Sequence, residues 1–380
     1  MAQSVPPRTD QHRLVEDHLN GGKPNGQETS TSMPAPSGPR PRLHYRKLDW
    51  SKAEMRFLEL RTTPRGLIED PVVCRMVQIP LDNDVDFIAI SSLLGDGDET
   101  EKIQINSQTV PIPAHIAQAL RHTRAVFAPH TQRSGSAGSG GSGSSRPRWL
   151  TQLMRHFGSK SSPGDGEHAE PILRIWIDCL CINPEDRRER AQQRSIMGRV
   201  YWKAQTVVGW VGLKIPQTDA GIRLIRDFDD AMPASFHEPG DRVLHPEHYS
   251  PHHEWAKAVI HHFDASAVGA IGTADFLNRS FFKRRWIIEE MALAKVATFL
   301  IGDAIVSWNQ LLRLNLAMEE FKDYPSNVCP AETRPMIHNF PLETIHALLD
   351  EFERRKAMEK LEGLNRSMAP SYDSRDTGST

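Results

Sequence analysis

The chain has 380 residues, with 46 Lys and Arg against 48 Asp and Glu, which gives a formal net charge of -2 at pH 7. This balance excludes the globally basic type of nucleic-acid-binding protein. Hydrophobic residues make up 38% of the chain, whereas a typical globular domain, counting Gly, has roughly 45–50%. Polar segments must therefore dilute a foldable core.

The cysteines and the apolar stretches indicate the compartment. Four cysteines, Cys74, Cys179, Cys181 and Cys329, are too few for a disulfide scaffold. The N-terminus lacks the apolar segment of a secretory signal. No apolar stretch reaches the roughly 20 uninterrupted residues of a membrane span. We therefore expect a cytoplasmic protein with reduced thiols, no membrane span and no nucleic-acid partner.

Three polar segments divide the chain. Residues 1–42 contain seven of the 27 prolines and predict a disordered tail, and residues 363–380 predict a second one. A Gly/Ser tract lies within a disturbed region at about 127–170. This region is either a linker between domains or an insertion into one domain. We expect a folded domain over 43–324 and a helical extension over 325–362.

The first half of the folded region predicts mostly strands. Two short edge strands are predicted at Phe57–Leu60 and Val72–Ile79, and a buried strand at Phe87–Ser92. A hairpin of Lys102–Ile105 and Thr109–Ile112 follows, and then a helix at Ala114–Ala125.

The second half alternates strands with helices. Predicted strands lie at Ile172–Asp178, Thr206–Val211, Ala297–Ile301 and Ala304–Ser307. Predicted helices begin at Asn183-Pro184 and at Ser250-Pro251 and cover Ala220–Phe228, Arg284–Lys295 and Trp308–Phe321.

This alternation predicts an α/β fold with a mostly parallel sheet and helices on both faces. Ligands bind such sheets at the carboxyl ends of the strands, near a topological switch point. Two segments, Ser91–Gly95 and Asp178–Asn183, follow predicted buried strands. We therefore expect the functional site there.

Two polar clusters have alternative interpretations. The motif Asp96–Thr100 follows a strand, as in Mg²⁺-dependent aspartyl phosphatases, but no later Lys with an Asp-Asp pair lies at an obvious strand end, so a solvated acidic turn is the preferred interpretation. The histidines between His245 and His262 resemble zinc ligands only weakly, because the helix start at Ser250-Pro251 separates His248 from His252. We expect exposed histidines and no metal site.

Two further patterns concern thiols and a carboxylate. We expect Cys179 and Cys181, two apart on an extended segment, to be buried at a strand end rather than paired with each other. On the helix from Arg284, Trp286 and Glu290 lie at i and i+4 on one face. A carboxylate beside an indole suits catalysis, although the edge of a buried helix face explains the same spacing.

Three ordered sequence blocks resemble the fungal heterokaryon-incompatibility (HET) domain. The central block resembles W-I-D-x-x-C-I-N-Q with its following helix and strand, the last one R-x-W-x-x-Q-E-x-x-x-A, and the first one A-L-S-Y-x-W-G-D. The matching residues are Ala89–Asp96, then Trp176, Ile177, Asp178, Cys181, Ile182, Asn183, Glu189, Gln193, Met197, Tyr201 and Ala204, then Arg284, Trp286, Glu290 and Ala294.

The resemblance implies fold, activity and site together. HET domains are similar to Toll/interleukin-1-receptor (TIR) domains, which have a flavodoxin-like sheet and many of which cleave NAD. It implies Glu290 as the catalytic carboxylate, and Ser91, Asp178, Asn183 and Trp286 as residues that bind NAD. NAD would be a substrate, with no tightly bound cofactor. The implied role is nonself recognition and programmed cell death, and the resemblance makes the Gly/Ser tract an insertion into one domain.

Departures from the family pattern keep other functions open. Ser92, Leu94, Pro184 and Glu289 stand where the family has Tyr, Trp, Gln and Gln. A non-enzymatic signalling module that associates with itself or with another signalling protein is one alternative. A degenerate, inactive relative is the other.

Overall fold

The protein is described by a computed structural model that covers residues 43–61, 68–93, 99–127, 150, 172–238, 240–260 and 268–324, together with single positions between 334 and 358. The predicted tails, nearly all of the Gly/Ser insertion, most of the extension after residue 324, and Asp96 and Asp98 of the acidic motif lie outside the described residues.

The described strands form one nine-stranded sheet in the order β5-β4-β2-β1-β6-β3-β7-β8-β9. Their bounds are β1 Glu54–Leu60, β2 Val73–Pro80, β3 Ile88–Ser92, β4 Thr100–Ile105, β5 Gln108–Pro113, β6 Leu173–Trp176, β7 Thr206–Gly212, β8 Ala297–Ile301 and β9 Ala304–Ser307.

The centre of the sheet confirms the predicted parallel α/β fold. Strands β6, β3, β7 and β8 are hydrogen-bonded neighbours and run parallel. In chain order they are the second, first, third and fourth of this set, which is the flavodoxin-type order. Strands β7 and β8 are buried along their whole length, as expected for parallel strands covered on both faces. The switch point lies between β3 and β7, the first and third strands of this set.

Antiparallel strands extend the sheet on both sides of this centre. Strand β1 pairs antiparallel with β2 and with β6, and β8 pairs antiparallel with β9. The hairpin of β4 and β5 forms as predicted and lies at one edge. The prediction that β1 and β2 are edge strands is wrong, because β2 pairs with β4 of that hairpin and β1 pairs with β6.

The described helices fall between or after these strands. The α-helices are α1 Ala114–Phe127, α3 Asp178–Cys181, α4 Arg187–Lys203, α5 Thr218–Ala231, α6 Asp241–Leu244, α7 Glu254–Ile260, α8 Val268–Asn278, α9 Arg285–Ala292 and α10 Trp308–Lys322. Short 3-10 helices lie at η2 Trp50–Lys52, η3 Pro246–Tyr249 and η5 Ser280–Lys283.

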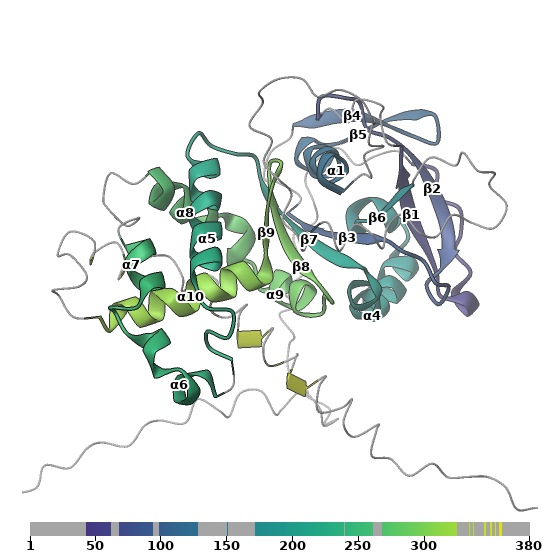
Figure 1. The fold of residues 1–380 in the computed structure, drawn as a ribbon. Helices are drawn as coiled ribbons and strands as arrows, with labels where there is room; N and C mark the ends of the chain where they lie inside the picture. The colour runs from purple at the N-terminus through teal and green to yellow at the C-terminus, as the bar shows by residue number, and fades with distance from the viewer. Residues whose placement is uncertain are drawn as a thin grey trace, which may run out of the picture. The chain divides into compact units, whose positions relative to one another are not determined.

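Helices cover both faces of the central strands. Helix α1 lies on one side of the sheet, and α4 and α9 lie together on the other (Figure 1). Helix α9 contacts both β3 and β7. Helices α5, α7, α8 and α10 form a separate group beyond β9 (Figure 1). The face with α4 and α9 therefore carries the residues that the sequence places at the strand ends.

Two local predictions around the β6 strand end are wrong. Helix α4 begins at Arg187, not at Asn183-Pro184, because Asp186 is its N-cap and accepts from the backbone N–H of Arg188 and Glu189. Residues 178–181, expected to be extended, form the short helix α3. Cys179 and Cys181 consequently lie on a helical turn rather than on one face of a strand.

Two predictions in the helical group also differ from the structure. Helix α7 starts at Glu254, later than Ser250-Pro251 suggested. Helix α8 is absent from the predicted elements. It packs tightly on α5, because a Cβ on Gly221 would lie 2.4 Å from the backbone of Gly272 and Thr273. The contact between these two glycines is tertiary. The sequence of α8 itself shows little of the apolar spacing by which a helix is predicted.

Candidate functional site

A hydrogen bond joins the end of β3 to α9. The Ser91 hydroxyl donates to Oε2 of Glu290 over 2.6 Å, between residues 199 positions apart in the chain. Ser91 is fully buried, and Glu290 is half-buried. The end of β3 therefore presents a polar contact to a carboxylate on α9, within the segment where the sequence predicts a functional site.

Tyr201 of α4 lies against the same carboxylate. Burial raises the pKa of the Tyr201 phenol well above its ordinary value, and the charges of Glu290 and Asp178 together with a hydrogen bond to Glu290 raise it further. The phenol therefore stays protonated near neutral pH and can donate to Glu290. Its ring meets Trp176 of β6 edge to face, with centroids 5.5 Å apart. The Nε1 of that buried Trp176 has no hydrogen-bond partner.

Asp178 begins α3 directly beyond the end of β6. Its Oδ1 accepts from the backbone N–H of Cys179 over 2.6 Å. Burial raises the pKa of Asp178, and this backbone hydrogen bond opposes the rise. Since Asp178 and Glu290 both act on Tyr201, the strand ends bring two carboxyl groups and one phenol into a common electrostatic environment.

A glycine lets α9 approach the sheet at this point. Gly209 of β7 is the strand neighbour of Ser91. A Cβ on Gly209 would lie 2.5 Å from Cζ of Phe281, in the turn that leads into α9. Residues paired across neighbouring strands point to the same face of a sheet. Because Gly209 has no side chain, the Phe281 ring packs against β7 on the same face as Ser91. This close packing lets α9 lie over the strands.

Asn183 belongs to a different group from Ser91 and Glu290. Its backbone N–H donates to Oε1 of Glu189 over 2.6 Å, and its own Oδ1 accepts from Glu185. Glu189 also pairs with the buried Arg56 over 2.5 Å. Arg56 in turn donates to the carbonyl of Cys181. This buried ion pair fixes the turn between α3 and α4, so Asn183 positions the backbone near the site.

The thiols near the site are suited to packing. Burial raises the pKa of Cys181 to about 12 and that of Cys179 well above its ordinary value. Asp178 nearby raises both further. A thiol held protonated is a poor nucleophile. The expectation of burial beside the end of β6 holds for Cys181, which is buried, whereas Cys179 is half-buried, and both lie on α3.

The structure thus brings together Ser91, Glu290 and the surroundings of Asp178, and it adds Tyr201. Sequence analysis placed Tyr201 only as a matching position in the central block. The one signal in the sequence is its helical spacing on the apolar stripe of α4. That spacing predicts a core residue and gives no indication of a contact with Glu290. Trp286 lies in α9, and its side chain is outside the described structure.

The fold and the site define an α/β protein with flavodoxin-type strand order and a carboxylate at the switch point. Residues 167–290 match the family model described as Heterokaryon incompatibility protein (HET). The match contains Asp178, Asn183 and Tyr201 and ends on Glu290. This part of the chain is therefore similar to that family.

A curated relative shows a similar likeness. The chain is 24% identical over 273 residues to Heterokaryon incompatibility protein 6, OR allele, of Neurospora crassa. The alignment covers 67% of this chain and 34% of that protein, so this chain spans about one third of the relative's length. No solved structure matches the chain, and the likeness to TIR domains stays a prediction. Among the described helices, none has the length and apolar character that crossing a bilayer requires.

Proposed function

We propose that this protein acts in heterokaryon incompatibility, in nonself recognition that leads to cell death, and that its Glu290 site cleaves NAD. The family match and the name of the Neurospora crassa relative support the first part. The hydrogen bond from Ser91 to Glu290 supports the second part. It holds a carboxylate at the switch point of a flavodoxin-type sheet, where ligands of such sheets bind.

The proposed reaction is hydrolysis of the bond between nicotinamide and ribose. That bond breaks with its electron pair leaving on nicotinamide, water adds to the ribose carbon, and the products are nicotinamide, ADP-ribose and a proton. The ribose carbon passes through an oxocarbenium-like state that carries positive charge. An ionised Glu290 stabilises this charge and accepts hydrogen bonds from the ribose hydroxyls.

Ser91 and Tyr201 would orient Glu290 in this reaction. Both donate hydrogen bonds to its carboxylate, so the group keeps one geometry before the substrate binds. Preorganised charge of this kind needs no rearrangement as the transition state forms. Asp178 at the neighbouring strand end would bind a second polar part of NAD, in line with its place in the central block.

The direct test is incubation of the purified full-length chain with NAD, followed by chromatography of nicotinamide. We expect nicotinamide to accumulate in proportion to protein concentration. NAD that stays intact at high protein concentration, with and without a macromolecular trigger from fungal extract, would remove the enzymatic part of the proposal.

The same contacts also favour a second candidate, a non-enzymatic module that self-associates. Glu290 links β3, α4 and α9 through Ser91 and Tyr201, which is how a half-buried structural carboxylate would be used. Sedimentation at several protein concentrations separates the two candidates. Concentration-dependent assembly without nicotinamide release favours the module, whereas nicotinamide release by a monomer contradicts it.

A further inference from the structure

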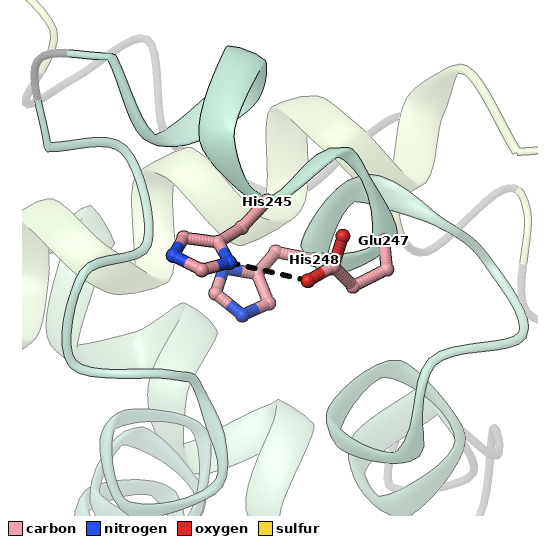
Figure 2. A group of neighbouring side chains, drawn as sticks. All are labelled: His245, Glu247 and His248. Carbon is pink, nitrogen blue, oxygen red and sulfur yellow. Dashed lines mark hydrogen bonds and ion pairs between the residues drawn. The ribbon is translucent and has the colours of Figure 1, made fainter.

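Two consecutive short turns in the helical group carry a cluster of potential metal ligands. His245 lies at the junction of α6 and η3, and Glu247 and His248 lie in η3. One ligand atom from each residue lies within 4.8 Å of the other two. Figure 2 shows the two imidazole rings beside each other, with the Glu247 carboxylate facing them. The sequence alone predicts only exposed histidines here.

One member of the cluster is held rigidly. The Nδ1 of His248 lies 3.2 Å from both carboxylate oxygens of Asp241, a residue only 3% exposed. The Tyr249 hydroxyl donates to Asp241 over 2.9 Å, and the Trp255 Nε1 donates to the His248 carbonyl over 2.7 Å. With the Nδ1 side of the ring held by this carboxylate, the Nε2 of His248 is the ring nitrogen available to a ligand.

The other two members are close to each other and more exposed than His248. The Nδ1 of His245 lies 3.2 Å from Oε1 of Glu247. Their side chains are 48% and 59% exposed, whereas that of His248 is 14% exposed. The His245 and His248 rings stack with centroids 4.8 Å apart. The cluster therefore combines one fixed nitrogen with a nitrogen and a carboxylate that can turn toward it.

We propose that His245, Glu247 and His248 form a binding site for one divalent transition-metal ion, with Zn²⁺ as the ion that the donor set fits best. Two imidazole nitrogens and one carboxylate oxygen are typical ligands of Zn²⁺, and they are too soft a set for Mg²⁺ or Ca²⁺. Water completes the coordination, because the exposed side of the cluster is open to solvent.

The arrangement around His248 is the second, independent indication of a metal site. Metal-binding histidines usually donate their other ring N–H to a carboxylate, which fixes the tautomer and orients the lone pair. Asp241 supplies this contact from a buried position. A surface histidine without a ligand needs no buried carboxylate partner, because water can form hydrogen bonds with both of its ring nitrogens.

The spacing of the ligand atoms is wider than a bound ion requires. Zinc bonds of about 2.0–2.1 Å place tetrahedral ligand atoms roughly 3.3 Å apart. Rotation of the exposed side chains of His245 and Glu247 closes this difference while His248 stays in place. The nearby His253 is occupied differently, since its Nδ1 accepts from the backbone N–H of Trp255 over 3.3 Å.

Calorimetric titration of the full-length chain with ZnCl₂ tests the site. We expect one saturable binding event in the wild type. His245→Ala removes an exposed ligand, and it should weaken binding at least about 10-fold. His252→Ala removes an exposed histidine outside the cluster and should leave the affinity unchanged. Asp241→Asn removes the carboxylate charge behind His248 and should weaken binding about 10- to 100-fold.

Thermal unfolding with and without Zn²⁺ gives a second readout, since an ion that binds only the folded chain raises Tm. We expect this rise in the wild type and in His252→Ala, and its loss in His245→Ala. His245 is exposed, so we expect its alanine variant to fold. The comparison of His245→Ala with the wild type therefore tests the site even if the Asp241 variant does not fold. Absence of saturable zinc binding, or equal affinity and an equal rise in Tm for His245→Ala, would overturn the proposal.

Discussion

The Ser91 hydroxyl donates a 2.6 Å hydrogen bond to the Glu290 carboxylate, and this contact joins the first strand of the flavodoxin-type set to the helix that precedes its last strand. The bond couples two sequence blocks that are 199 residues apart. Stability and activity should both depend on it.

Ser91→Ala should lower both quantities. A hydrogen bond to a charged group contributes about 1.5–3 kcal/mol, so we expect the free energy of unfolding to fall by roughly that amount. NAD cleavage should fall about 10-fold or more, since Glu290 loses part of its orientation. Urea unfolding and nicotinamide release measure the two effects. An alanine variant that matches the wild type in both would show that the hydrogen bond does no positioning.

Tyr201→Phe removes the phenol that faces Glu290 and keeps the ring against Trp176. Because the pKa of Tyr201 is raised well above its ordinary value, this phenol is a neutral donor throughout the range near pH 7. We expect slower NAD cleavage at every pH from about 6 to about 9, with an unchanged shape of the pH profile. A profile whose basic limb disappears in Tyr201→Phe would mean that Tyr201 itself titrates.

Asp178→Asn should change how stability depends on pH. Burial raises the pKa of Asp178 above its ordinary value of 3.8, so the folded state binds this proton more tightly than the unfolded state does. The resulting stability is present below pH 3.8 and is lost as pH rises through the raised value. Asparagine keeps the shape and cannot ionise.

The gain in unfolding free energy from Asp178→Asn over the wild type should therefore grow as pH rises from about 4 and then level off. Urea unfolding at a series of pH values measures this difference. A difference that stays constant across the range would show that Asp178 has the same proton affinity in the folded and unfolded chain.

Breaking the buried ion pair should be far more costly than breaking an exposed one. Glu189→Ala leaves the buried Arg56 and the Asn183 N–H without their carboxylate, and we expect a loss of about 3–5 kcal/mol. Arg199→Ala removes an exposed partner of Asp82 and should cost at most about 1 kcal/mol. Similar losses for both variants in urea unfolding would contradict the structural role of Glu189.

The packing of α9 on the sheet depends on Gly209, which has no side chain. Gly209→Ala places a Cβ 2.5 Å from Cζ of Phe281, and we expect a loss of about 1–3 kcal/mol from overpacking. Gly198→Ala in α4 places its Cβ at an ordinary 3.5 Å from Leu293. It should instead stabilise the chain by about 0.5–1 kcal/mol. Unfolding curves that rank these two variants in the opposite order would refute the packing account.

Sequence patterns predicted most strands because their apolar runs are short, β-branched and bounded by turns, as at Phe87–Ser92. They also predicted the strand end of Ser91 and the helix of Glu290. They could not predict the position of β1 and β2, because whether a strand lies at an edge depends on pairing with residues far away in the chain. Helix α8 was missed for a similar reason, since close contact with α5 sets its apolar face.

The site was predicted in the same uneven way. Ordered blocks named Asp178 and Glu290, but the contact of Tyr201 with Glu290 is tertiary and has no spacing rule. Ligand binding by Asn183 stays a prediction, and the spacing of the block could not predict that its backbone N–H donates to Glu189, which also binds Arg56.

Nicotinamide release by Glu290→Gln, compared with Glu289→Gln, tests the central claim most directly. Both changes remove one carboxylate from α9, and Glu289→Gln installs the residue that the resembling family carries there. The account predicts a loss of about 10²- to 10³-fold in Glu290→Gln, as for other removed electrostatic stabilisers of a transition state, and activity close to the wild type in Glu289→Gln. Equal activity of the Glu290→Gln variant and the wild type would contradict the assignment of Glu290.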